Sequence, residues 1–250
     1  ARAIAAAAEL PPGNYRVAVV GRARFGWFSS RAFVVRSRPF RVASARELEA
    51  ERASRLPPVF KTSNLAVGVV SGGYGSEGIL AALAEAQGVE ALALNRLTEE
   101  FLRPCRVVVF PQPRQRGATS EEAVAALRQF VVRGGGLLAT HDAPGYRGHP
   151  VLFPEVCEGG ARRVEGSAWR VTATHPLTAG LPRGKPLPHS YYDAIALHPG
   201  PAGRVVAEAL GKDGAPGGAV AVCGTVGKGR YAAIGLALGI DEADRETAPR

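Results

Sequence analysis

The fold is decided by the stretch Gly134-Gly135-Gly136-Leu137-Leu138-Ala139-Thr140-His141-Asp142. Its apolar part, residues 137–140, predicts a buried strand, and the polar pair His141-Asp142 follows where that strand ends. Residues 123–133, just before it, have apolar side chains at helical spacing, and the glycines end that helix. Ligands and reacting groups in α/β folds gather at the carboxyl ends of strands. His141 is therefore the first candidate for a functional residue.

Strand and helix patterns alternate on both sides of this stretch. Apolar runs at residues 65–70, 89–94 and 105–110 predict buried strands, and residues 79–84 predict a helix between the first two. Continuous apolar strands that alternate with helices predict a parallel sheet covered on both faces. We therefore expect an α/β fold with a doubly wound, mostly parallel, flavodoxin-like sheet. Short strands follow residue 150, and those at residues 219–223 and 231–238 should form a hairpin that closes the sheet.

The chain also predicts a division into segments. Residues 1–43 carry short alternating strand patterns, which predict an antiparallel β segment similar to the end of an immunoglobulin-like or fibronectin-like sandwich. Three strands are too few for a sandwich, so this segment should continue an upstream domain, pack on the following domain or pair with another protein chain. Residues 44–60 read as a short charged helix or linker, and residues 61–250 as the α/β domain. The absence of methionine and the start at Ala1 predict a piece of a longer polypeptide.

Composition limits the classes of function. A hydrophobic content of 46% in 250 residues excludes a disordered chain, and no apolar run is long enough to span a membrane, so we expect a soluble and, as one hypothesis, exported protein. The net charge of +9 comes from 31 basic against 22 acidic residues. We interpret it as a solvated basic face; an anionic partner is the alternative, but no nucleic-acid motif supports nucleic acid. Cys105, Cys157 and Cys223 form no CxxC pair, so neither a zinc site nor a redox dithiol is expected.

A glycine-rich turn follows the first apolar strand. Residues 73–78, Gly-Tyr-Gly-Ser-Glu-Gly, match the G-x-G-x-x-G pattern of dinucleotide sites in the required strand-to-helix context. About twenty residues later the expected acidic residue is replaced by Asn95-Arg96, a pair that suits a 2′-phosphate. We interpret the turn mainly as a tight turn facing a ligand, with Gly73, Tyr74 and Gly75 as binding residues. An NADP-binding domain is the less favoured alternative.

The polar residues at the strand ends form one candidate site. His141, Asp142 and Glu77 should meet at the carboxyl edge of the sheet, where they would be the catalytic residues of an enzyme. The segment 189–193, His-Ser-Tyr-Tyr-Asp, is expected to fold over the same edge, with His189 and Tyr192 contacting a ligand. A zinc site formed by His141, Asp142 and His189 matches no known spacing, so we predict neither a metal nor a cofactor.

Residues 65–241 resemble the ThuA-like, or trehalose-utilisation, branch of the class I glutamine amidotransferase-like superfamily. The resemblance is carried by three stretches: residues 125–136 (AALRQFVVRGGG), residues 175–182 (HPLTAGLP) and residues 227–236 (GKGRYAAIGL). It implies an amidotransferase-like α/β fold and, within this branch, action on a carbohydrate or related small molecule.

The chain departs from the superfamily at its reacting residues. Amidotransferases carry a cysteine at the turn where this chain has His141, and a His-x-Glu pair that this chain lacks altogether. Glutamine hydrolysis by that route is therefore not expected. ThuA-like members do carry histidine at this turn, but the histidine of their opening glycine loop is missing from residues 72–75. Our leading hypothesis is a non-hydrolytic binding or structural module of a larger assembly. The alternative is a carbohydrate-directed enzyme with His141 as general base, oriented by Asp142 or Glu77.

Overall fold

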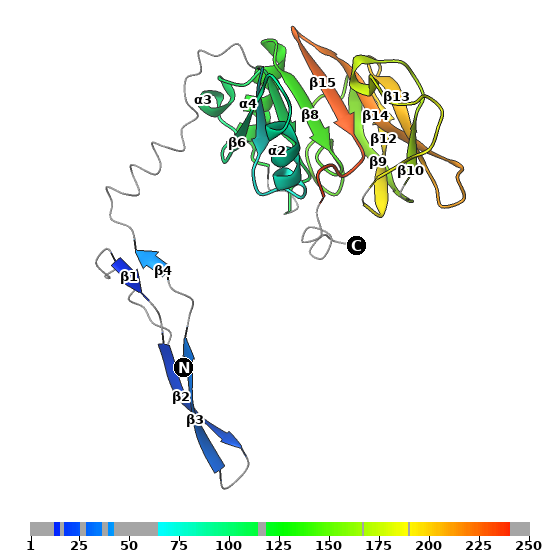
Figure 1. Ribbon diagram of the computed structural model, residues 1–250. Coiled ribbons are helices and arrows are strands. Elements are labelled where there is room, and N and C mark those ends of the chain that lie inside the picture. Colours follow the sequence, from blue (N-terminus) through cyan, green and yellow to red (C-terminus); the bar gives the residue numbers. More distant parts are fainter. Residues whose placement is uncertain are drawn as a thin grey trace. The chain divides into compact units, whose positions relative to one another are not determined.

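The computed structural model describes residues 65–114, 119–166, 168–189 and 191–240, together with the backbone of four strands between residues 13 and 42. The chain divides into two units, Ala1–Pro57 and Pro58–Arg250, and each is described by itself. Figure 1 follows both along the sequence.

Two antiparallel ribbons make up the described part of the first unit. Strand β1 (Gly13–Tyr15) pairs with β4 (Phe40–Val42), and β2 (Ala18–Phe25) pairs with β3 (Ser29–Arg36). The short antiparallel β segment predicted before the α/β domain is therefore present. The predicted linker, residues 44–60, lies outside the described residues.

The second unit is built on one nine-stranded sheet with the order β11-β10-β13-β14-β15-β8-β7-β5-β6. Its parallel part, which confirms the predicted fold class, consists of β5 (Leu65–Val70), β6 (Val89–Leu94), β7 (Val107–Phe110), β8 (Gly136–Thr140) and β15 (Gly229–Ile234). Its antiparallel part consists of β10 (Ala168–Val171), β11 (Leu187–Pro188), β13 (Arg204–Leu210) and β14 (Pro216–Val226). The predicted closing hairpin is β14 with β15, and β15 adds to the sheet beside β8.

Helices cover both faces of the parallel strands. Helix α4 (Glu121–Val132) packs with Val108 of β7, whereas α2 (Ser76–Ala84) packs with the neighbouring Val109. Successive residues of a strand point to opposite faces, so the two helices lie on opposite sides of the sheet. Helix α4 begins at Ser120, whose hydroxyl accepts a hydrogen bond from the amide of Ala123 at 3.2 Å. No helix within the described ranges has both the length and the apolar character needed to cross a membrane.

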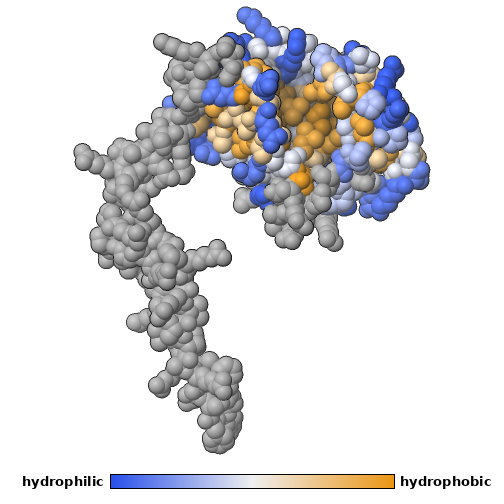
Figure 2. All heavy atoms as spheres, in the orientation of Figure 1, coloured by the Kyte–Doolittle hydropathy of each residue, from blue (hydrophilic) through white to orange (hydrophobic). Residues whose placement is uncertain are grey.

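The chain makes a long excursion between β8 and β15. It contains the antiparallel ribbon of β9 (Cys157–Glu165) and β12 (Asp193–Pro199), which contacts β14, and a short 3-10 helix, η1 (Pro176–Thr178). Neither β9 nor the four-residue helix α3 (Glu99–Leu102) is predicted by the sequence pattern. Figure 2 shows apolar surface gathered in a hollow beside α2, over β8 and β15. Leu138 and Ala232 of these two strands are only partly buried.

Candidate functional site

The turn after β8 holds His141 in an unusual backbone conformation. Its φ is +50°, in the left-handed region that residues other than glycine rarely adopt, and its amide donates to the carbonyl of Ile234 on β15 at 2.7 Å. The side chain is 2% exposed. Such a conformation costs about 1–3 kcal/mol and persists only where the surrounding contacts hold it. The side-chain contacts of His141 are therefore the first place to look for what holds the turn.

Each ring nitrogen of His141 faces a buried carboxylate. Nε2 lies 3.1 Å from Oδ1 of Asp193, and Nδ1 lies 3.0 Å from Oδ1 of Asp142, the latter as a close ionic contact without hydrogen-bond alignment. Burial lowers the pKa of His141, but the two carboxylates more than offset it, so the pKa stands above its ordinary value. The two carboxylates thus favour the protonated, imidazolium form of the ring.

Two arginines extend this arrangement on either side. Arg163 of β9 pairs through Nε with Oδ2 of Asp193, and Nη1 of Arg147 lies 3.9 Å from Oδ2 of Asp142. The same Asp142 oxygen accepts a hydrogen bond from Nε2 of Gln112 at 3.4 Å. Charges of alternating sign therefore run through Arg163, Asp193, His141, Asp142 and Arg147, which we call the elbow charge cluster. Each buried charge has an opposite neighbour, as buried charges require.

Aromatic side chains cover the elbow charge cluster. The ring of Tyr191 stands edge-on to His141 with centroids 5.3 Å apart, and its hydroxyl donates to that of Tyr192 at 3.1 Å. Tyr74 and Ile240 pack with Tyr191 in the same buried group. Water and a ligand are thus kept away from the imidazole ring.

The predicted site residues differ in whether they contact the elbow charge cluster. Asp142 contacts His141 directly, whereas Glu77 is exposed in the first turn of α2 and makes no contact with His141. His189 accepts a hydrogen bond at Nδ1 from the amide of Tyr191 at 3.2 Å. Burial lowers the pKa of His189, and the nearby charge of His141 adds to this effect, against the opposing influence of the Gly166 backbone and Asp193. The pKa values of the two histidines are therefore shifted in opposite directions.

The glycine turn before α2 is packed against the protein's own backbone. Gly75 caps α2 with a φ of +81°, and a Cβ there would overlap with the carbonyl oxygen of Leu238. A Cβ on Gly78 would overlap with the carbonyl oxygen of Gly239. The close approach that a pyrophosphate would need at this helix is taken by residues 238–239. This packing argues against the dinucleotide interpretation of the G-x-G-x-x-G pattern.

Solved structures share this architecture at low sequence identity. A ThuA-like protein from Bacteroides uniformis superposes with a TM-score of 0.53 at 14% identity, over 76% of this chain and 90% of that one. The mmIFT52 N-terminal domain gives a TM-score of 0.52 at 10% identity, over 73% of this chain and 92% of that one. Cytoplasmic protein STM1381 from Salmonella typhimurium LT2 gives 0.47 at 16% identity, over 89% and 84%. The fold is class I glutamine amidotransferase-like. No family model and no curated protein matches the chain.

A cavity of about 450 Å³ opens at the carboxyl edge of the amidotransferase-like sheet, away from His141. Strand β5 lies between β6 and β7, so the connections that leave β5 and β7 diverge and open a crevice, which is where ligands bind in such sheets. We call it the switch-point cavity. Of the predicted binding residues only Gly73 lines it; Tyr74 lies beside it, with the guanidinium of Arg114 4.3 Å from its ring centroid.

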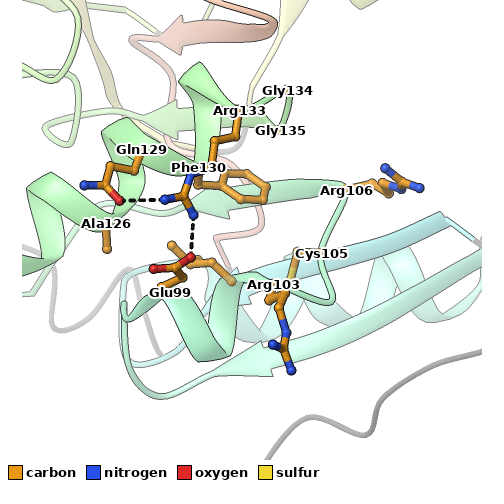
Figure 3. Close-up of a pocket in the computed structure, with 11 residues that line it drawn as sticks. Glu99, Arg103, Cys105, Arg106, Ala126, Gln129, Phe130, Arg133, Gly134 and Gly135 are labelled. Carbon is orange, nitrogen blue, oxygen red and sulfur yellow. Dashed lines mark hydrogen bonds and ion pairs between the residues drawn. The ribbon is translucent and has the colours of Figure 1, made fainter.

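A second cavity, of about 290 Å³, lies between α3 and α4 at the opposite edge of the amidotransferase-like sheet. Figure 3 shows Arg133 reaching across it to Glu99, while Arg103 and Arg106 point away from its interior. The ring of Phe130 fills the space beside Gly135, where a Cβ would overlap with it. These contacts join two helices, and we interpret this cavity as a packing gap.

Cys223 of β14 lies beside His175, outside the elbow. Sγ of Cys223 is 3.5 Å from Nε2 of His175, whose Nδ1 accepts a hydrogen bond from the amide of Leu177 at 3.2 Å. The neutral ring therefore carries its proton on Nε2 and cannot take one from the thiol, which donates to the carbonyl of Arg204. Burial raises the pKa of Cys223. The pair lacks the base that a nucleophilic cysteine needs. No described residues form a three-ligand group for a metal ion.

Sequence reasoning misses two members of the elbow charge cluster in particular. Tyr191 and Asp193 lie against His141, but the sequence pattern assigns Asp193 no role. Arg163 lies on β9, a strand whose sequence gives no strand signal. The only signal in the sequence for this pairing is Asp193 itself, an acidic residue directly after Tyr191 and Tyr192.

Proposed function

We propose that the α/β domain is a non-hydrolytic amidotransferase-like module, which binds a partner or ligand without transforming it at the elbow. One observation supports this most directly: both ring nitrogens of His141 are occupied by Asp142 and Asp193. A general base must present a free, deprotonated nitrogen to its substrate. Here the ring is buried, flanked by two carboxylates that favour its charged form, and covered by Tyr191.

The alternative, an enzyme with His141 as general base, requires contacts that these residues do not make. Asp142 stands where an orienting carboxylate would be, but then Nε2 should face a substrate, and it faces Asp193 instead. Glu77, the other candidate, is exposed and makes no contact with the histidine. A carbohydrate ligand therefore remains compatible with binding and not with catalysis by His141. In this proposal residues 1–43 join the module to other protein chains or to an upstream domain.

The protonation and accessibility of His141 test the proposal. Long-range ¹H–¹⁵N spectra of uniformly labelled full-length protein should show two protonated ring nitrogens for His141 at pH 7, and a pKa above 6.5. Diethyl pyrocarbonate followed by peptide mass analysis should modify exposed His198 quickly and leave His141 intact. A neutral His141 ring that is modified as fast as His198 would overturn the proposal.

A further inference from the structure

We propose that the switch-point cavity is a binding site for a small phosphomonoester. The elbow is not that site, because its charged groups already face one another and the His141 ring is covered. This inference rests on the proposed function only in taking the role of the domain to be binding; the cavity itself carries the choice of ligand.

The charge of the cavity lining selects an anion. Two arginines line it, Arg96 after β6 and Arg114 after β7, and the described lining residues include no aspartate or glutamate. Arg96 is exposed, and the guanidinium of Arg114 lies over the ring of Tyr74. The two guanidinium groups come from separate connections that meet at one crevice. Two guanidinium groups at one crevice suit a phosphomonoester, which carries about −1.5 to −2 near neutral pH, better than a singly charged carboxylate.

The backbone at the cavity supplies further donors. Gly72 has a φ of +78°, and nothing lies within 4 Å of the position where its Cβ would be. The amides of Gly72 and Gly73 donate to no described backbone acceptor, whereas those of Ser71 and Tyr74 on either side do. The open space at Gly72 lets a phosphate oxygen approach the chain closely there. Asn95 and Ser71 add neutral polar groups to the same lining.

The size and the remaining walls limit the rest of the ligand. The volume of about 450 Å³ lies within the range of roughly 300–1,000 Å³ for small-molecule sites. Val70, Leu97 and Phe110 give the lining an apolar part. A phosphate on a body the size of a sugar or a single nucleoside fits these limits.

Calorimetric titration of the full-length protein tests the site. The probes are inorganic phosphate, ribose 5-phosphate and adenosine 5′-monophosphate, with acetate, ribose and adenosine as the matched compounds that lack the phosphate. We expect the phosphorylated probes to bind and the matched compounds not to. Arg96→Gln and Arg114→Gln should each weaken binding at least tenfold. Arg106→Gln, the same change at an exposed arginine on the opposite edge of the sheet, should leave the affinity within twofold.

The outcomes separate this inference from the proposed function. Absence of phosphate binding at millimolar concentration, or equal weakening by Arg96→Gln and Arg106→Gln, would overturn the phosphomonoester site and leave the spectroscopic test of His141 untouched. Release of inorganic phosphate from a bound probe would keep the site and overturn the non-hydrolytic function. Circular dichroism of each variant shows that it is folded before its affinity is compared.

Discussion

Replacement of Asp193 by asparagine is the sharpest perturbation of the elbow charge cluster. The carboxylate is 1% exposed and faces two cations, His141 at 3.1 Å and Arg163 through its Nε. Asparagine keeps the shape and one acceptor oxygen, but it turns an amide donor toward one cation. Removing one partner of a buried ion pair costs about 3–5 kcal/mol. His141 can lose its proton in response, and the Arg163 side chain is 30% exposed. The expected loss of unfolding free energy is therefore near the lower end, about 3 kcal/mol.

Urea denaturation of the full-length protein, followed by far-ultraviolet circular dichroism, measures this loss. With a denaturant slope of about 2 kcal/mol per molar, the midpoint should fall by about 1.5 M. Asp213→Asn is the matched control, because Asp213 is exposed and its only described contact, to the amide of Ala215, survives the change. The control should stay within about 0.5 kcal/mol of the parent. If Asp193→Asn also stays within that margin, the elbow charge cluster does not hold the turn and the reasoning fails.

Three further predictions follow from the same structure. Gly75→Ala should destabilise the protein by about 3 kcal/mol or more, because strain at positive φ is joined by overlap with the Leu238 carbonyl. Gly72→Ala, at a similar φ in open space, should cost only about 1–2 kcal/mol. Denaturation curves of the two variants compare these losses. Because folding raises the pKa of His141, its contribution to stability is complete below about pH 6.5, the pKa of the unfolded chain, and is lost as the pH rises through the pKa of the folded protein. Unfolding free energies at pH 6 and pH 9 should show this decline. A rise in the unfolding free energy between these two pH values would contradict it. Burial raises the pKa of Cys105 to about 11 and leaves all three thiols covered, so a disulfide-exchange reagent at pH 8 should label them rapidly only in denaturant.

The parallel core could be predicted because its strands are continuous apolar runs between helices. Strand β9 could not, because Val164 is the only one of its buried positions that has a strand-favouring side chain. Cys157 and Gly159 are buried near its start, and charged residues occupy its middle. Arg163 therefore gave no sign that it would meet Asp193. The pairing depends on the register of β9 with β12, in which Asp193 lies opposite Glu165.

The glycine turn was ambiguous for a different physical reason. A glycine is required wherever something approaches the backbone closely, and the sequence does not say what approaches. Around Gly75 the approaching group is the chain itself, at Leu238. At Gly72, three residues earlier, the space is empty and borders the switch-point cavity. One glycine-rich stretch thus combines a packing contact with an open backbone, and only the fold separates the two.

The closed elbow and the open cavity have a common origin in the order of the strands. The excursion between β8 and β15 brings Tyr191 and Asp193 over the turn that follows β8, and it does not reach the divergence between β5 and β7. Tyr74 nevertheless contacts both places, because it packs in one buried cluster with Tyr191 and the guanidinium of Arg114 lies over its ring. An anion that draws Arg114 toward the cavity would remove a cation from the Tyr74 ring without touching a charge of the elbow cluster.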